Sequence, residues 1–219
     1  MIASMRANLF FFLIAGLLFA ACKHEHATPS LPLQALRVGL SSETEIGKMG
    51  PAGHDIVRRP WVGPIIQVLA EETPDGAARM RRNRIAGSGI APDRLFEHGV
   101  DNMRKAYSQP IREQSVTMAK ARVEVTRFPD NHTAARLLLS ELWSKLAAEA
   151  GGALYAAAPA RDIVFWTTSR DESDQRALRR QAQIAFQARS EPISPAILRW
   201  TGSGWALEDA NPLPASATQ

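Results

Sequence analysis

One stretch, from Asn131 to Trp166, constrains the fold of this chain more than any other. Its first half carries apolar side chains at helical spacing, and its second half has two short apolar runs separated by Pro159-Ala160-Arg161-Asp162. The residues involved are mostly Leu, Ala, Val, Ile, Phe and Trp, which build cores far more readily than active sites. The stretch therefore predicts a helix and two buried strands, and it leaves the chemistry of the protein open.

The first half of this stretch predicts an amphipathic helix. Asn131 or Thr133 can cap its N-terminus, and Gly151-Gly152 would end it. The runs at 153–158 and 163–168 predict strands, and the second is nearly all apolar or β-branched, which indicates a central strand. The apolar stripe of the helix consists of Ala135, Leu138, Leu139, Leu142, Trp143 and Leu146.

Similar patterns place the other elements. Pro92 fits the first position of a helix that runs to about Ala106, and Ser169-Arg170-Asp171-Glu172 matches a capping box for a last helix to about Arg189. Strands are predicted at 35–40, from Ile65 with Pro64 at its start, within 115–128, and in a terminal hairpin of 197–200 and 205–207. Residues 41–59 predict a loop or a partly ordered flap. We therefore expect a single α+β domain over 35–207, with its core in about 62–207. A mixed or mainly antiparallel sheet of about five to seven strands would pack with about three helices.

Composition excludes several classes of protein. The chain has 219 residues, of which 45% are hydrophobic and 22% charged, which suits one globular domain with tails rather than a disordered chain. The formal charge of +4 comes from 26 basic and 22 acidic residues, so no nucleic-acid partner is expected. A single cysteine, Cys22, excludes an intramolecular disulfide and a cysteine-only metal site.

The N-terminal residues predict export. Arg6 supplies a positive start, residues 7–21 form an apolar run, and Ala20 and Ala21 stand immediately before Cys22. This resembles a bacterial lipoprotein signal, in which a peptidase cuts before a cysteine whose thiol carries diacylglycerol. Phe19 stands where Leu is usual, and it is equally large and apolar. We therefore predict a signal peptide over 1–21 and lipidation at Cys22.

Two alternatives stay open for this segment. One is a conventional cleaved signal in which Cys22 is incidental, and the other is an uncleaved anchor, although the run is shorter than the roughly 20 residues that span a bilayer. Acyl chains at Cys22 would bind the membrane, because each buried methylene contributes about 0.8 kcal/mol. Lys23 stands where Asp would retain a lipoprotein at the inner membrane. This favours the outer membrane facing the periplasm, with a soluble periplasmic or secreted protein as the alternative.

The regions that flank the domain predict flexible segments. Residues 22–34 contain two prolines and no hydrophobic periodicity, which is typical of a tether, and 208–219 predict a disordered tail. His24 and His26 could share a metal ion, but the other histidines are scattered and no second cysteine is present. No metal or other cofactor is therefore expected.

A basic patch follows the middle strands. It consists of Arg79, Arg81, Arg82 and Arg84 within six residues, and these side chains are candidate binding residues for phosphate, anionic lipid or nucleic acid. No aromatic residues alternate with them, which argues against stacking on single-stranded nucleic acid. The alternative is a solvated strand or loop that faces Glu71, Glu72 and Asp75.

Two pieces of the chain together resemble the YtpQ-like bacterial proteins, a family defined as a domain of unknown function. They are Ile90-Ala91-Pro92-Asp93-Arg94-Leu95 with Val100-Asp101-Asn102-Met103-Arg104, and Leu137 to Trp143 followed by Ala157 to Phe165. The resemblance covers roughly residues 65–186. It implies a fold and carries over no catalytic residue, and the export signal is a departure from the family.

Arg161 and Asp162 are the strongest candidate binding residues, because charges at the entry to a buried strand need partners. The alternative is a structural ion pair or a self-capped turn. His98 with Glu97 or Asp101 could exchange protons, but these residues share an ordinary helix surface. No familiar hydrolase, phosphate-binding, metal or nucleotide motif occurs, so no catalytic residue is assigned.

Two functions remain open from the sequence. The first is a lipid-anchored binding or scaffold domain that engages an envelope protein. The second is an envelope enzyme of unfamiliar class with Arg161 and Asp162 near its pocket. The absence of familiar motifs favours the first.

The lipid anchor predicts a direct outcome in bacteria that express the full chain. Cys22→Ser should abolish palmitate incorporation and globomycin-sensitive processing, because the thiol is the acyl acceptor. The neighbouring substitution His24→Ser should leave both unchanged. Labelling that survives Cys22→Ser would contradict lipidation at this residue.

Overall fold

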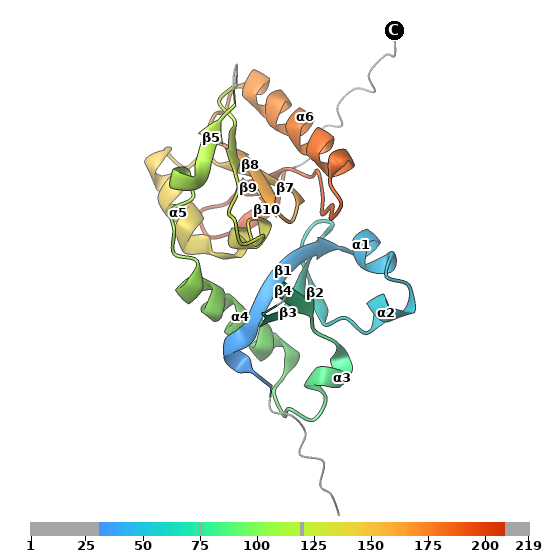
Figure 1. Cartoon of the computed structure of the whole chain (residues 1–219). Helices are drawn as coiled ribbons and strands as arrows, with labels where there is room; N and C mark the ends of the chain where they lie inside the picture. Colours follow the sequence, from blue (N-terminus) through green and yellow to red (C-terminus); the bar gives the residue numbers. More distant parts are fainter. Residues whose placement is uncertain (1–30, 75, 119–120, 209–219) are drawn as a thin grey trace, which may run out of the picture.

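The fold is that of a computed structural model, which describes residues 31–74, 76–118 and 121–208. These residues form an α+β domain with two antiparallel sheets, one of four strands and one of six (Figure 1). The predicted fold class is confirmed. The strands divide between two sheets, because hydrophobic patterns locate strands without specifying which strands pair.

The smaller sheet is built around one long strand. Its strands are β1 (Leu36–Ser42), β2 (Arg58–Val62), β3 (Ile65–Thr73) and β4 (Gly76–Arg79). The strand β3 pairs with β1 along one edge and with β2 and then β4 along the other. The change of partner occurs at Leu69, whose N–H donates to Val57 O at 2.9 Å and whose carbonyl accepts from Met80 N at 2.8 Å.

Four helices accompany this sheet. They are the one-turn helices α1 (Glu43–Gly47), α2 (Pro51–His54) and α3 (Arg82–Ile85), and the long helix α4 (Pro92–Ala106). The segment 41–59, predicted as a loop or a partly ordered flap, contains α1 and α2. The Ser42 hydroxyl caps α1 by accepting from Glu45 N at 3.2 Å, and Pro51 begins α2. Helix α4 matches its predicted bounds. Gly99 lets it approach β1, since a Cβ there would lie 2.8 Å from Val38 Cγ2.

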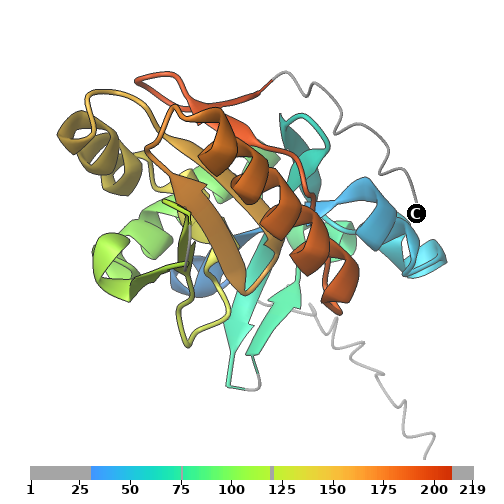
Figure 2. The same cartoon turned by 90° about the horizontal axis from the view of Figure 1, so that it is seen from above.

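The larger sheet has the order β10-β9-β7-β8-β6-β5. Its strands are β5 (Ser115–Thr117), β6 (Glu124–Thr126), β7 (Tyr155–Ala160), β8 (Ile163–Thr167), β9 (Leu198–Trp200) and β10 (Trp205–Leu207). Strand β8 is buried along its length and central, as predicted. Alternate residues of β8 face opposite sides, so Ile163 and Phe165 pack with helix α6 (Glu172–Ala188), while Val164 and Trp166 pack in the core on the other face (Figure 2).

The predicted helix after Asn131 is interrupted, which corrects the expectation from the sequence. A 3₁₀ turn, η3 (Ala134–Leu138), precedes α5 (Ser140–Glu149). The Trp143 indole N–H donates to Arg136 O at 2.8 Å, and the Trp205 indole N–H donates to Leu137 O at 3.0 Å. These carbonyls would accept the N–H groups of residues 140 and 141 in a continuous α-helix. Two tryptophans from outside η3 therefore stabilise the break.

The predicted N-terminal caps of two helices also differ from the structure. The Thr133 hydroxyl accepts from Phe128 N at 2.8 Å instead of capping, and Asn131 adopts a positive φ of 57°. Asp171 is the N-cap of α6, and Ser169 Oγ accepts from Asp171 N at 3.2 Å. The capping box is therefore wrong, while Gly151-Gly152 ends α5 in left-handed conformations as predicted.

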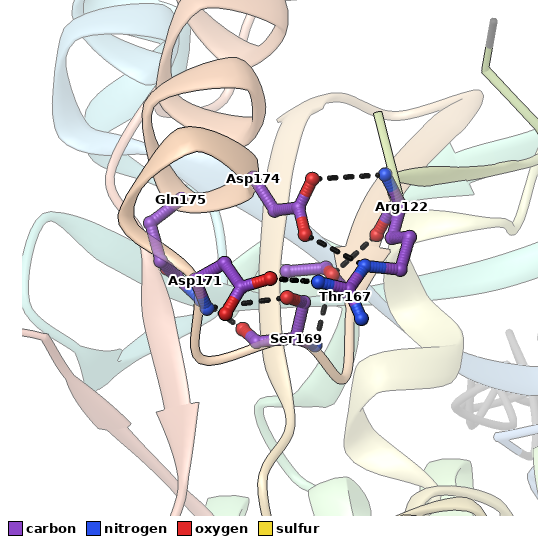
Figure 3. A network of polar contacts seen from close by, with 6 residues as sticks. All are labelled: Arg122, Thr167, Ser169, Asp171, Asp174 and Gln175. Atoms are coloured by element: carbon purple, nitrogen blue, oxygen red, sulfur yellow. Dashed lines mark hydrogen bonds and ion pairs between the residues drawn. The ribbon is translucent and has the colours of Figure 1, made fainter. Parts of the chain in front are cut away.

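A polar network holds the start of α6 against the β5–β6 region (Figure 3). Asp174 is buried and accepts from Arg122 N and Arg122 Nε, both at 3.0 Å, while Asp171 pairs with the same guanidinium. Gln175 Nε2 donates to Ser169 O at 2.7 Å. Hydrogen bonds from Ser169 and the Arg122 backbone lower the pKa of Asp174, so its carboxylate is ionised at neutral pH. The network is structural, because its polar groups bind one another.

The segment of η3 and α5 joins the two sheets. Trp143 packs in one cluster with Leu40 and Ile65 of the smaller sheet and with Trp166 of the larger sheet. On the other side, Leu139 packs in the cluster beneath α4. The stretch that dominates the sequence is therefore shared by both halves of the core.

The ends of the chain lie partly outside the described residues. The signal segment, Cys22, and the tail 209–219 are not described. Leu31 and Leu33 pack against the α4 cluster and η1 spans Leu33–Ala35, so the domain begins within the predicted tether of 22–34. Among the described residues, no helix is long and apolar enough to cross a membrane.

The interrupted helix predicts a specific loss of stability. Trp143→Phe should destabilise the domain by about 2 kcal/mol or more, because Arg136 O loses a buried donor and the smaller ring leaves a void. Trp61→Phe removes the same atoms from a half-buried site and should cost less. Urea unfolding of both variants measures the difference, and equal losses would contradict a special contribution from Trp143.

Candidate functional site

Arg161 and Asp162 form the turn between β7 and β8, and each has a charged partner. Arg161 Nη1 lies 3.2 Å from Glu191 Oε1, and Asp162 Oδ2 lies 2.9 Å from Arg189 Nη1. All four side chains are partly exposed, so each pair contributes little to stability. The segment after α6 thus occupies the charges that the sequence identified as candidate binding groups.

Two of the four arginines of the basic patch have different carboxylate partners, and two have none among the described residues. Arg79 Nη2 lies 3.9 Å from Glu191 Oε1, and Arg84 Nε lies 3.7 Å from Glu71 Oε2. Arg81 and Arg82 are exposed, and no ion pair joins either to another described residue. Glu191 therefore brings Arg79 and Arg161 together, although they lie far apart in the sequence.

A buried guanidinium that the sequence did not indicate lies near this point. Arg136 is 1% exposed and forms a two-pronged ion pair with Asp130, with N–O distances of 2.9 and 2.6 Å. Its Cζ lies 3.6 Å from the centroid of the Phe128 ring and 4.4 Å from that of Tyr107. The two aromatic faces and one carboxylate stabilise a charge that water cannot reach.

His132 completes this group, which we call the Arg136 cluster: Tyr107, Phe128, Asp130, His132 and Arg136. The imidazole stacks on the Tyr107 ring with centroids 5.4 Å apart and an angle of 25°. Burial lowers the pKa of His132, and the positive charges of Arg161 and Arg136 lower it further. The carboxylates of Asp130 and Glu72 act in the opposite direction but do not outweigh burial. The imidazole is therefore neutral at pH 7.

The pKa values of Asp130 and Tyr107 in the cluster are shifted as well. Burial acts to raise the pKa of Asp130, but hydrogen bonds from Arg136 and the His132 backbone outweigh it and lower the pKa. Burial raises the pKa of Tyr107, whose hydroxyl lies beside Arg37, itself paired with Glu72. A neutral base, a phenol and fixed guanidinium groups thus meet where the two sheets join. Three guanidinium Nε atoms, of Arg37, Arg136 and Arg161, are buried without a hydrogen-bond partner.

A groove of about 430 Å³ lies elsewhere, between α5 and the segment before β5. We call it the α5 groove. Its lining combines an apolar base with charged side chains, and it includes Ser108, Pro110, Ile111, Arg112, Glu113, Glu141, Leu142, Lys145, Leu146 and Glu149. Arg161, Asp162 and His132 are not among these lining residues. The groove adjoins β5, an edge strand whose Val116 is 69% exposed.

The remaining candidates do not assemble into a site. Asp101 pairs with Arg104 at 2.5 Å and Glu97 pairs with Arg94 at 2.6 Å on the exposed surface of α4, where His98 also lies. Within the described part of the chain, no three His, Cys, Asp or Glu residues gather as metal ligands. His24, His26 and Cys22 lie outside it.

Comparison with known proteins adds no relative. No family model, curated protein or solved structure matches this chain. The resemblance to YtpQ-like proteins therefore stays a prediction.

The stacked imidazole predicts a dependence of stability on pH. The free energy of unfolding should decrease as the pH falls below about 6.5, because the unfolded chain then protonates His132 more readily than the folded one. His132→Gln and His132→Phe should each reduce this dependence, and the second keeps a ring on Tyr107. Urea unfolding at pH 7.5 and 5.0 measures it. Identical pH dependence in all three proteins would contradict the prediction.

Proposed function

We propose that this chain is a secreted, lipid-anchored protein of the bacterial cell envelope whose domain binds or organises an envelope protein. The export signal that ends in Ala20-Ala21-Cys22 supports the location. Lys23 after the cysteine favours the outer membrane facing the periplasm. The described domain begins at Leu31, close behind the anchor.

One observation carries the binding role. Arg161 and Asp162 are engaged by Glu191 and Arg189, while among the described residues the α5 groove is open and β5 is the outermost strand of its sheet. An edge strand presents unpaired backbone groups that an extended segment can complete. Surfaces of this kind serve recognition more readily than catalysis.

An envelope enzyme is the second candidate, and the Arg136 cluster is the observation that favours it. A neutral His132 beside Arg161 could accept a proton. However, neither residue lines the α5 groove, so the acid-base groups and the recess lie apart. The binding role therefore agrees better with the geometry.

Photocrosslinking in living bacteria tests the proposal. A photoreactive phenylalanine at Lys145 in the groove, or at Val116 on the edge of β5, should give a discrete adduct with an envelope protein. The same group at Gln187, on the exposed face of α6, is the matched control and should give none.

A blocking variant makes the result specific. Leu142→Glu places a charge at the base of the α5 groove and should remove the Lys145 adduct without unfolding the half-buried site. The same adduct pattern from all three positions, or an adduct that survives Leu142→Glu, would contradict binding at this face.

A further inference from the structure

Two exposed arginines of the basic patch are not explained by the fold. Arg81 is the N-cap of α3 and Arg82 begins it, and both side chains lie on the surface without a carboxylate partner among the described residues. The backbone N–H of Arg82 donates to the Asp55 carbonyl at 2.8 Å. Arg84 is partly neutralised by Glu71 at 3.7 Å. The surface of α3 therefore carries a local excess of positive charge.

This surface lies at the end of the molecule where the described chain begins. Leu31 and Leu33 pack on the same apolar cluster as Ile85 of α3. Figure 1 shows α3 and the first described residues together at one end, with α6 at the opposite end. The arginines therefore lie at the end of the domain where the described chain begins.

The length of the connecting segment limits how far this end can lie from the anchor. Eight residues, 23–30, separate Cys22 from Leu31, and at about 3.3–3.6 Å each they span at most about 30 Å. A lipid at Cys22 would thus keep the α3 surface close to the headgroups. Weak attraction becomes effective at such a short tether length, because the local concentration of the partner is high.

We propose that the surface of α3 with Arg81 and Arg82 docks on the anionic phospholipid surface that holds the anchor. This rests on the proposed lipid anchor and adds an orientation to it. Each guanidinium close to an anionic membrane strengthens binding about fivefold. The docked domain would direct its opposite end, with α6, away from the membrane.

Helix α6 supplies a matched control. Arg170 and Arg180 are exposed, and no described residue forms an ion pair with either. They lie just before and within the helix at the opposite end of the molecule from α3. Reversal of two charges there changes the net charge by the same amount as reversal at α3.

Energy transfer from the lipidated full-length protein in vesicles tests the orientation. The sulfur of Cys22 would carry the diacylglyceryl group, so a donor dye can be attached to a single new thiol, at Asn83→Cys on α3 or at the exposed Ser173→Cys at the start of α6. The acceptor is a dye-labelled lipid in vesicles of phosphatidylcholine, with or without phosphatidylglycerol.

Phosphatidylglycerol should increase transfer from position 83 and not from position 173. R81E/R82E should lower the ratio of docked to undocked protein by at least about 30-fold, because the loss of two positive charges alone gives this factor and the new carboxylates are repelled, and R170E/R180E should not. Salt at 1 M, where the screening length is about 3 Å, should abolish the increase. Circular dichroism checks that each variant is folded.

The outcomes separate the two proposals. If the protein floats with vesicles but transfer from position 83 is unaffected by phosphatidylglycerol or by R81E/R82E, docking by α3 is wrong and the anchor stands. An equal loss in R170E/R180E would show a net-charge effect and overturn docking by this surface. If no variant floats with vesicles, the anchor and the docking both fail.

Discussion

The ion pair between Arg136 and Asp130 is the interaction on which the junction of the two sheets depends. A guanidinium without access to water is costly unless it is paired, and here the carboxylate lies beside it while two aromatic faces cover it. Tyr107 follows α4 on the side of the smaller sheet, and Phe128 follows β6 of the larger sheet. The Arg136 guanidinium in η3 therefore contacts side chains from both halves. The Arg136 carbonyl also accepts a hydrogen bond from the Trp143 indole N–H.

The parts of the fold that local patterns determine were predictable. Helix α4 begins at Pro92 and ends as expected, and β8 is central because nearly every residue in it is apolar. The break before α5 was not predictable, because its causes include Trp205, which lies 68 residues from its acceptor Leu137. The division into two sheets likewise depends on pairing between distant strands, which periodicity does not encode.

In the candidate site, too, local patterns identified single residues but not the distant partners that they contact. Arg161 and Asp162 stood out beside a buried strand, but their partners come from the irregular segment after α6. The basic patch read as one surface, although the end of β4 and the turn into α3 direct its side chains to different neighbours. Asp130, His132 and Arg136 come from one short segment, and Tyr107 joins them from the end of α4. Arg136 looks in sequence like an ordinary polar residue of an amphipathic helix, and no local signal could have placed Tyr107 beside it.

The terminal hairpin has a consequence for the order of folding. Trp205 belongs to the last described strand, yet its indole satisfies Leu137 O in the middle of the chain and its ring packs edge-on against Trp143, with centroids 5.3 Å apart. A polypeptide that emerges N-terminus first cannot complete this junction until almost its whole length has appeared. The domain therefore stays unfinished while the chain is synthesised, and its last described strand closes it only when synthesis is nearly complete.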